Sequence, residues 1–252
     1  MKPRLLFALL GFFCVTALSA AEFATKQPVL VSVHGAWAGG WQFKKVAVLL
    51  EAKGWQVHRP SMSGLGEHFN TARTDIGLAT HIDDIVNFML FEDLHDVILL
   101  GHSYGGMVIT GVADRIPERV SRLIYLDAFL PENGESLMGR RKDGSLPVER
   151  SAKDGFIIPD WVKPGKLPPK DVPHPLKTFT DPISLKNPAA TAKIPTTYIL
   201  TVDPGQKPAD DDFYPSSERA KARGWPVLIM EADHVPMWRK PQALADLLLG
   251  IH

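Results

Sequence analysis

The chain has 252 residues, of which 45% are hydrophobic and 22% are charged, and its 28 basic residues balance its 28 acidic residues. This composition is typical of a globular protein with a sizeable core, and the length favours one domain over two full domains. A net charge of zero gives no basic surface for nucleic acid or for an anionic membrane, so we expect neither as a partner.

The first residues show the three-part pattern of a secretory signal peptide. Lys2 and Arg4 precede an apolar run over 5–18, and small residues follow it. The run is too short for a comfortable membrane span, so an uncleaved anchor is the weaker alternative. We expect cleavage after Ala20 or Ala21, and hence a periplasmic or secreted protein without a stable membrane span.

The only cysteine, Cys14, lies within this expected signal peptide. The mature protein would therefore carry no thiol, which excludes a cysteine nucleophile and a thiolate metal site. No spacing of other ligand residues suggests a metal, and we expect no cofactor.

Short apolar segments alternate with helical patterns along the rest of the chain. Expected strands cover 28–34, 55–60, 96–103, 122–128, 196–201 and 226–233, and expected helices cover 41–54, 81–92, 106–117, about 212–223 and 241–251. Strict alternation with strands that are apolar throughout indicates an α/β fold. We predict a mostly parallel sheet of about six strands with helices on both faces.

The alternation breaks between about residues 129 and 192. This stretch is rich in proline and poor in periodicity, and long irregular segments of this kind are often functional lids. We therefore expect a signal peptide over 1–21, followed by one domain over 22–252 that carries a cap insertion at about 129–192.

The sequence GHSYGG, Gly101 to Gly106, joins an expected strand to an expected helix. It satisfies the pattern G-x-S-x-G in the strand–turn–helix setting that a nucleophile elbow requires. Gly101 and Gly105 relieve crowding around a strained serine, and the helix N-terminus favours negative charge beside it. We interpret Ser103 as a nucleophile; the alternative is a glycine-rich turn without chemistry.

A serine nucleophile needs a base, and His234 is the candidate. It follows the last apolar strand and precedes the final helix, at the carboxyl edge of the sheet, where sites of parallel sheets form. His102 lies beside the nucleophile, so we expect its ring to point elsewhere. The remaining candidates are expected to be surface or satisfied histidines: His58, His68, His81, His95, His174 and His252.

Two backbone amides are expected to form an oxyanion hole for the tetrahedral intermediate. Tyr104, directly after the nucleophile, offers one N–H group. In VHGAWAGGW, the pair His34 and Gly35 turns the chain sharply and presents the N–H of Ala36. The alternative for this second segment is a simple glycine-rich loop.

Three stretches, VSVHGAWAGGWQF, VILLGHSYGGMVITGVADRIPERVSRLIYLDAFLPENG and EADHVPMWRKPQALADLL, carry a resemblance to a known family. They resemble the α/β-hydrolase branch that holds the plant methylesterases, the hydroxynitrile lyases and many small bacterial esterase-like proteins. The resemblance covers nearly all of the expected mature chain outside the cap. It implies the α/β-hydrolase fold, and the order of Ser103 before His234 agrees with it.

The resemblance also bears on the reaction. In the lyases a threonine and a lysine assist cyanide release, and the corresponding positions here are Gly35 and Val235, which favours an esterase over a lyase. Epoxide hydrolases and dehalogenases carry a nucleophilic aspartate, and Ser103 in its place argues against both.

The carboxylate that orients His234 has two candidates, Asp127 and Asp203, each at the end of an expected strand. In the plant methylesterases the acid follows the penultimate strand, which favours Asp203. Asp127 ends the strand expected beside that of Ser103, about 4.8 Å away, and the small esterase-like relatives carry a similar YLDAF segment. We therefore favour Asp127, with Asp203 as the alternative acid and a turn-forming role as the alternative for Asp127.

The predicted activity is that of an exported serine hydrolase that cleaves carboxylic esters of small, mainly apolar molecules through an acyl-enzyme. A hydroxynitrile-lyase-like enzyme and a non-catalytic binding protein for small ligands are the alternatives, and the oligomeric state is left open. The residues expected to line the substrate pocket are Trp37, Phe156, Ile157, Ile158, Trp161 and Met237. For those that belong to the cap, the alternative is packing between cap and core.

Overall fold

The computed structural model describes residues 27–139 and 152–251. The expected signal peptide over 1–21, its cleavage after Ala20 or Ala21, and Cys14 lie outside these residues. His252 and part of the expected cap, residues 140–151, lie outside them as well.

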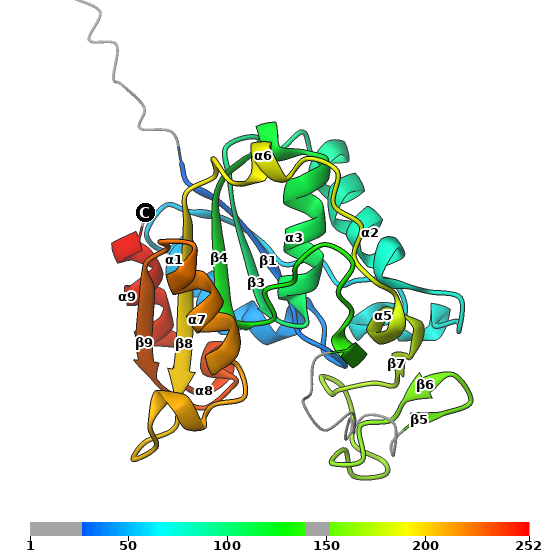
Figure 1. The fold of residues 1–252 in the computed structure, drawn as a ribbon. Helices are drawn as coiled ribbons and strands as arrows, with labels where there is room; N and C mark the ends of the chain where they lie inside the picture. The colour runs from blue at the N-terminus through cyan, green and yellow to red at the C-terminus, as the bar shows by residue number, and fades with distance from the viewer. Residues whose placement is uncertain (1–26, 140–151, 252) are drawn as a thin grey trace, which may run out of the picture.

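A six-stranded parallel sheet forms the centre of the fold (Figure 1). Its strands lie in the order β2 (Gln56–His58), β1 (Val29–Val33), β3 (Val97–Ser103), β4 (Val120–Ala128), β8 (Thr196–Val202) and β9 (Val227–Glu231). The prediction of a mostly parallel sheet of about six strands is confirmed. Because all the strands run the same way, their carboxyl ends meet at one edge, where the loops that follow them gather.

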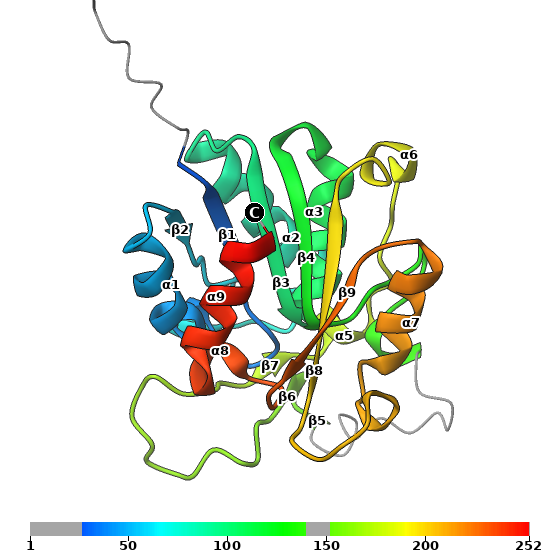
Figure 2. The same cartoon turned by 90° about the vertical axis from the view of Figure 1, so that its left-hand side faces the viewer.

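Helices cover both faces of this sheet (Figure 2). One face packs against α2 (Leu78–Phe91), α3 (Gly105–Arg115) and α7 (Tyr214–Ala222), and the other against α1 (Lys44–Glu51), α8 (Pro236–Arg239) and α9 (Pro241–Ile251). Strands β1 and β8 are buried along their whole length, because each lies between two other strands and has helices over both faces, whereas the edge strands β2 and β9 are partly exposed. This is the physical reason that neither strand contains a charged residue, although β1 contains one serine and β8 three threonines.

Short 3₁₀ turns complete the connections between these elements. The helix expected over 41–54 begins as the turn η1 (Gly40–Phe43), and the helix expected over 81–92 begins earlier, at Leu78. The other turns are η2 (Gly66–Thr71), η3 (Pro117–Arg119), η4 (Leu137–Gly139) and η5 (Pro208–Asp210).

The segment between β4 and β8 carries a small second sheet beyond the carboxyl edge of the main one (Figure 1). Its antiparallel strands are β5 (Ala152–Lys153), β6 (Phe156–Ile157) and β7 (His174–Pro175), and the short helices α5 (Lys177–Thr180) and α6 (Pro188–Thr191) follow them. In the described part of the chain, this segment occupies the region where the sequence predicts a cap.

The return from this segment to the main sheet is fixed by one buried carboxylate. Asp114 of α3 is 3% exposed, and its two oxygens accept the backbone N–H groups of Lys186 and Asn187 at 2.8 and 2.7 Å. An unpaired carboxylate at such a place would be costly, so these bonds hold the end of the cap segment against α3.

Within residues 27–139 and 152–251, no helix combines the length and the apolar character needed to cross a membrane.

Candidate active site

The turn after β3 has the geometry of a nucleophile elbow. Ser103 ends the strand with a positive backbone angle, φ 53°, a region that is strained for residues other than glycine. A Cβ atom on Gly101 would lie 2.6 Å from the carbonyl oxygen of Gly105, and one on Gly105 would lie 2.6 Å from the carbonyl oxygen of Val33. The packing therefore requires both glycines that flank the serine, and it leaves the N-terminus of α3 beside Ser103.

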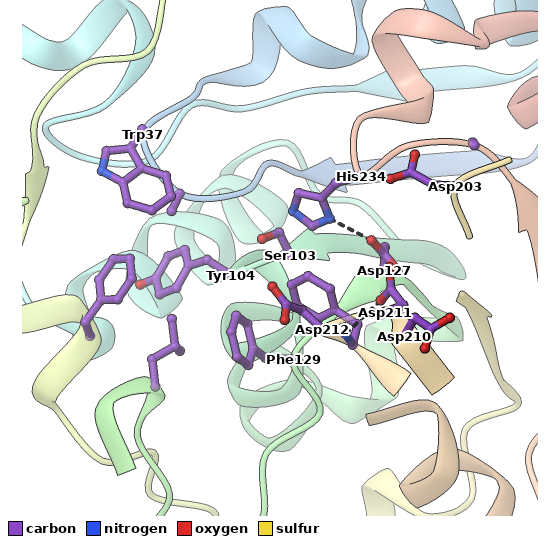
Figure 3. Close-up of a pocket in the computed structure, with 15 residues that line it drawn as sticks. Trp37, Ser103, Tyr104, Asp127, Phe129, Asp203, Asp210, Asp211, Asp212 and His234 are labelled. Atoms are coloured by element: carbon purple, nitrogen blue, oxygen red, sulfur yellow. Dashed lines mark hydrogen bonds and ion pairs between the residues drawn. The ribbon is translucent and has the colours of Figure 1, made fainter. Parts of the chain in front are cut away.

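Asp127 and His234 are joined by a hydrogen bond of 2.6 Å between the carboxylate Oδ2 and the ring Nδ1 (Figure 3). Asp127 is fully buried, and its other oxygen accepts the N–H of Thr201 at 3.1 Å. A carboxylate at this place holds the proton of the imidazole on Nδ1 and leaves Nε2 free to accept another. Asp203, the alternative candidate, lines the same cavity, but the Nδ1 of His234 is directed to Asp127.

A β-bulge aims the Asp127 side chain. In the pairing of β3 with β4, His102 lies opposite Leu126 and Ser103 lies opposite Ala128, so Asp127 is the extra residue. Bulges of this kind bend a strand and redirect a side chain, and Asp127 also has a positive φ, 43°. Strain of this kind costs about 1–3 kcal/mol per residue and persists only where the surroundings enforce it.

The ring of His234 is held between two other rings. Phe213 stacks on it, with 4.9 Å between ring centroids and planes 5° apart, and the His102 ring lies 4.6 Å away. The Nε2–H of His102 donates to the backbone oxygen of His234 at 2.6 Å. Burial and the neighbouring His234 hold the pKa of His102 well below its ordinary value, so the His102 ring is neutral where it hydrogen-bonds the backbone of His234.

His102 and Phe213 are functional residues that the sequence did not reveal. His102 was expected only to point away from Ser103, and the GHS pattern at residues 101–103 gives no sign that its ring reaches the loop of His234. Phe213 lies in a segment that showed no distinctive motif. Both contacts bring together positions more than twenty residues apart, which periodicity and local motifs do not report.

The loop after β1 presents the first of the two amides expected in an oxyanion hole. The Nδ1–H of His34 donates to the carbonyl oxygen of Gly35 at 2.8 Å, and its Nε2 accepts the N–H of Met62 at 3.1 Å. Because a trans peptide is planar, holding the Gly35 carbonyl also fixes the direction of the Ala36 N–H in the same peptide group. A Cβ on Gly35 would lie 2.9 Å from the His102 ring and 3.1 Å from the Ser103 Cβ, so this position requires glycine.

Tyr104 offers the second amide, at the start of α3. Its side chain is fully buried, and its hydroxyl donates to the Nδ1 of His81 at 2.9 Å, while the His81 Nε2–H donates to the carbonyl oxygen of Ser63 at 3.0 Å. Burial lowers the pKa of His81 to about 4, so this pair is neutral. The network fixes the residue that follows Ser103.

These groups meet in one cavity of about 530 Å³. Around Ser103, aromatic side chains such as Trp37 and Tyr104 lie on one side, and Asp203 and Asp210 lie on the other (Figure 3). The lining consists of Ala36, Trp37, Ser103, Tyr104, Asp127, Phe129, Leu137, Phe179, Asp203, Asp210, Asp211, Asp212, Phe213, Ala232 and His234.

The structure corrects the expected pocket. Trp37 lines the cavity, whereas Phe156, Trp161 and Met237 do not. Met237 is fully buried in the core on the face of α1 and α9, because α8 turns it into the sheet. Trp161 is 56% exposed and packs edge-on against Trp37 at 5.0 Å.

For Ile157 the alternative, packing between cap and core, agrees with the structure, because this residue is 1% exposed and belongs to the hydrophobic core. Ile157 and Ile158 do not line the cavity either, since β6 contributes to the second sheet. Ile157 acts through its backbone, because its carbonyl oxygen accepts the indole N–H of Trp37 at 3.1 Å. In their place, Phe129, Leu137 and Phe179 supply the apolar lining, and of these only Phe129, two residues after Asp127, carried a positional signal.

Four carboxylates of the loop after β8 line the acidic side of the cavity, Asp203, Asp210, Asp211 and Asp212. Burial and the nearby charge of Asp127 raise the pKa of Asp211 to about 6. The Oδ1 of Asp211 accepts the backbone N–H of Phe213 at 2.7 Å, which places that ring against His234. Among the described residues, no group of three or more histidine, cysteine and acidic side chains is arranged to hold a metal ion.

Comparison with known sequences gives matches over almost the whole described chain. The sequence profile of the alpha/beta hydrolase family matches residues 30–247. A carbendazim hydrolyzing esterase of Nocardioides is 36% identical over 247 residues, covering 88% of this chain and 98% of the relative. Methylesterase 1 of Arabidopsis thaliana is 28% identical over 254 residues, covering 88% of this chain and 94% of the relative.

Solved structures show the same fold. An extracellular alpha/beta-hydrolase from a Paenibacillus species, described as sharing structural and functional homology with tobacco salicylic acid binding protein 2, is similar with a TM-score of 0.71. The match has 23% sequence identity and covers 88% of this chain and 98% of that one. A pyrethroid hydrolase is similar with a TM-score of 0.66 at 23% identity, covering 89% of this chain and 96% of that one.

Proposed function

The chain belongs to the alpha/beta hydrolase family, and we propose that it hydrolyses carboxylic esters of small, mainly apolar molecules with Ser103, His234 and Asp127 as its catalytic triad. Esterases and methylesterases among its relatives make it a serine hydrolase of the carboxylesterase type. The observation that carries the proposed triad is the 2.6 Å bond between His234 and Asp127, in a cavity that Ser103 also lines.

The first half of the reaction forms an acyl-enzyme. The Oγ of Ser103 attacks the ester carbonyl carbon while the Nε2 of His234 takes the hydroxyl proton. The carbonyl π electrons move to the oxygen, and the amides of Ala36 and Tyr104 stabilise that oxyanion. When the carbonyl re-forms, the alcohol leaves with the proton that His234 returns to it.

The second half releases the acid. Water enters the place of the alcohol, His234 takes its proton, and the hydroxide oxygen attacks the acyl carbon. Collapse of the second tetrahedral intermediate breaks the bond to Ser103, whose oxygen regains the proton from His234. Throughout, the buried Asp127 carboxylate stabilises the imidazolium that forms.

The cavity supports a choice of substrate. Its volume of about 530 Å³ suits a small molecule, and Trp37, Phe129 and Phe179 offer apolar contact for one half of the ester. The aspartates on the other side make an anionic ester a poor fit. The 36% identical relative is named for carbendazim hydrolysis, so carbendazim belongs in the substrate panel beside aromatic and aliphatic methyl esters.

Two positions in the site favour an esterase over a hydroxynitrile lyase. Gly35 has no side chain and its position leaves no room for one, and Val235 carries no charge, so the two assisting groups implied for a lyase are absent. A cyanide-release assay on hydroxynitriles belongs in the same panel, and turnover there without ester cleavage would contradict the proposed function.

A fluorophosphonate probe tests the nucleophile directly. The wild-type protein should be labelled at Ser103 and should lose its ester turnover in proportion to labelling, whereas Ser103→Ala should do neither. The variant should unfold at the same denaturant concentration as the wild type, since the change removes one hydroxyl and keeps the flanking glycines. Labelling at another residue, or none at all, would refute the serine mechanism.

Export is a separate proposal that rests on residues 1–21 alone. The basic start, the short apolar run and the small residues that follow support removal of this segment during secretion. Intact-mass analysis of protein recovered outside the cytoplasm should give a chain that begins at Ala21 or Glu22. Recovery there with Met1 retained would exclude this processing.

A further inference from the structure

We propose that His174, a residue of the cap segment, is a positioning residue that aims the Ala36 amide at the oxyanion. This inference rests on the proposed function, because it concerns the same reaction. It assigns to the cap a part in transition-state stabilisation, in addition to enclosing the substrate.

The residue after Ala36 is held by the cap through all three of its polar groups. The backbone N–H of Trp37 donates to the Nδ1 of His174 at 3.0 Å, and its indole N–H donates to the carbonyl oxygen of Ile157 at 3.1 Å. Its carbonyl oxygen accepts the N–H of Val172 at 2.8 Å. Trp37 has a positive φ, 63°, which a bulky side chain adopts only where its surroundings enforce it.

These contacts control Ala36 through peptide geometry. Ala36 lies between two planar peptide groups, one shared with Gly35 and one shared with Trp37. The His34 side chain holds the first through the Gly35 carbonyl, and His174 holds the second through the Trp37 N–H. With both planes fixed, the two backbone angles of Ala36 are fixed too, and its N–H keeps one direction in the cavity.

The hydrogen bonds of His174 select the ring form that this role needs. Its Nε2–H donates to the Oγ1 of Thr178 at 2.7 Å, and the Thr178 hydroxyl donates to the carbonyl oxygen of Pro175 at 2.8 Å. The proton therefore lies on Nε2, and Nδ1 keeps its lone pair for Trp37. The ring is fully buried, and burial together with the neighbouring His81 and His34 holds its pKa well below the ordinary value.

Packing keeps the ring in this place. The Tyr104 ring lies edge-on to it at 5.1 Å and the Phe179 ring at 5.0 Å, and both of these residues line the cavity. His174 itself is not part of the lining, so it acts through Trp37 and not by contact with the substrate.

Two substitutions separate positioning from packing. His174→Leu removes the acceptor for the Trp37 N–H, whereas His174→Asn offers an amide oxygen near the position of Nδ1. For His174→Leu we expect kcat to fall about 10- to 100-fold with KM changed by less than about threefold, because a misdirected oxyanion donor acts mainly on the transition state. His174→Asn should recover at least about half of that loss on a logarithmic scale.

A trifluoromethyl ketone provides a readout that a merely structural role would not move. Its adduct with Ser103 places an oxyanion in the hole, so its inhibition constant should rise in parallel with the fall in kcat for His174→Leu. Ile183→Ala is the matched control, since Ile183 is a cap residue that is 2% exposed and does not line the cavity. It should lower the unfolding midpoint while the ketone affinity stays unchanged.

One measurement on the wild-type protein needs no variant to fold. The backbone amide proton of Trp37 should exchange with solvent far more slowly than amides of exposed loops, because His174 accepts it in a buried place. Fast exchange would overturn the proposal, as would equal losses for His174→Leu and His174→Asn or an unchanged ketone affinity in His174→Leu. Failure of the proposed function is distinct from these, because the wild-type protein would then neither take the fluorophosphonate label at Ser103 nor cleave esters.

Discussion

Acid should destabilise this protein through its buried histidines. His34, His81, His102 and His174 are all buried, and burial lowers the pKa of each below the ordinary 6.5. For His34 and His81 the pKa falls to about 4. In both of these rings one nitrogen donates to a carbonyl oxygen and the other accepts a hydrogen bond, so an added proton would face a donor.

The sign and the size of the effect follow from proton uptake. Between pH 6.5 and about 4 the unfolded chain binds protons at His34 and His81 that the folded protein does not, so the free energy of unfolding falls as the pH falls through this window. At about pH 5 each of the two histidines lowers the free energy of unfolding by roughly 2 kcal/mol, and below about pH 4 each lowers it by about 3 kcal/mol. The free energy of unfolding of a typical domain is only about 5–15 kcal/mol, so this loss is large.

Urea unfolding followed by tryptophan fluorescence measures this free energy at a series of pH values. The test variant is His81→Gln. It should lower the overall stability, but its stability should depend less on pH, because the proton uptake of one buried histidine is removed. His95→Gln is the control, since His95 is a surface residue and meets solvent in both states. Equal stability at about pH 5 and about pH 8, or an unchanged slope in His81→Gln, would refute the reasoning.

Three further predictions concern the site. Asp127→Asn should lower kcat by about 10⁴-fold at neutral pH, while Asp203→Asn should cost about tenfold or less, and the reverse ranking in steady-state assays would move the acid to Asp203. Gly35→Ala should abolish most ester turnover, because the new Cβ would lie 2.9 Å from the His102 ring and 3.1 Å from the Ser103 Cβ. Tryptophan fluorescence should still report a folded protein, and full activity would contradict the tight packing of this loop. The raised pKa of Asp211, about 6, predicts that KM for a cationic ester falls as the pH rises through this value, because the carboxylate becomes charged. A neutral ester of the same size should show no such trend, Asp211→Asn should remove it, and a trend that persists in Asp211→Asn would exclude this carboxylate as its source.

The sequence by itself determined the fold and the chemical type of the site. Alternating mainly apolar segments and helical patterns predicted the parallel sheet, because strands covered on both faces have no row of side chains that faces solvent. The motif around Ser103 is local, since the strand, the turn and the helix that make the elbow are consecutive in the chain. The position of His234 after the last strand followed from the same order of elements.

Tertiary structure alone decided which partners meet. Asp127 and Asp203 both end strands at the same edge, and only the bulge in β4 and the folded loop of His234 direct Asp127 to the ring. Local patterns do not report such a choice, because it depends on the register between strands and on backbone angles of single residues.

The cavity wall and the support of the oxyanion loop lie still further from sequence patterns. Phe179 and Phe213 line the cavity, and His174 supports the loop of Trp37. All three come from segments with little periodicity, and each contacts a residue far away in the chain. Met237 and Trp161 carry the expected apolar character, yet packing turns one into the core and leaves the other at the surface. Burial of apolar area is non-directional, so composition establishes that such side chains pack, and only the assembled fold determines which of them face the substrate.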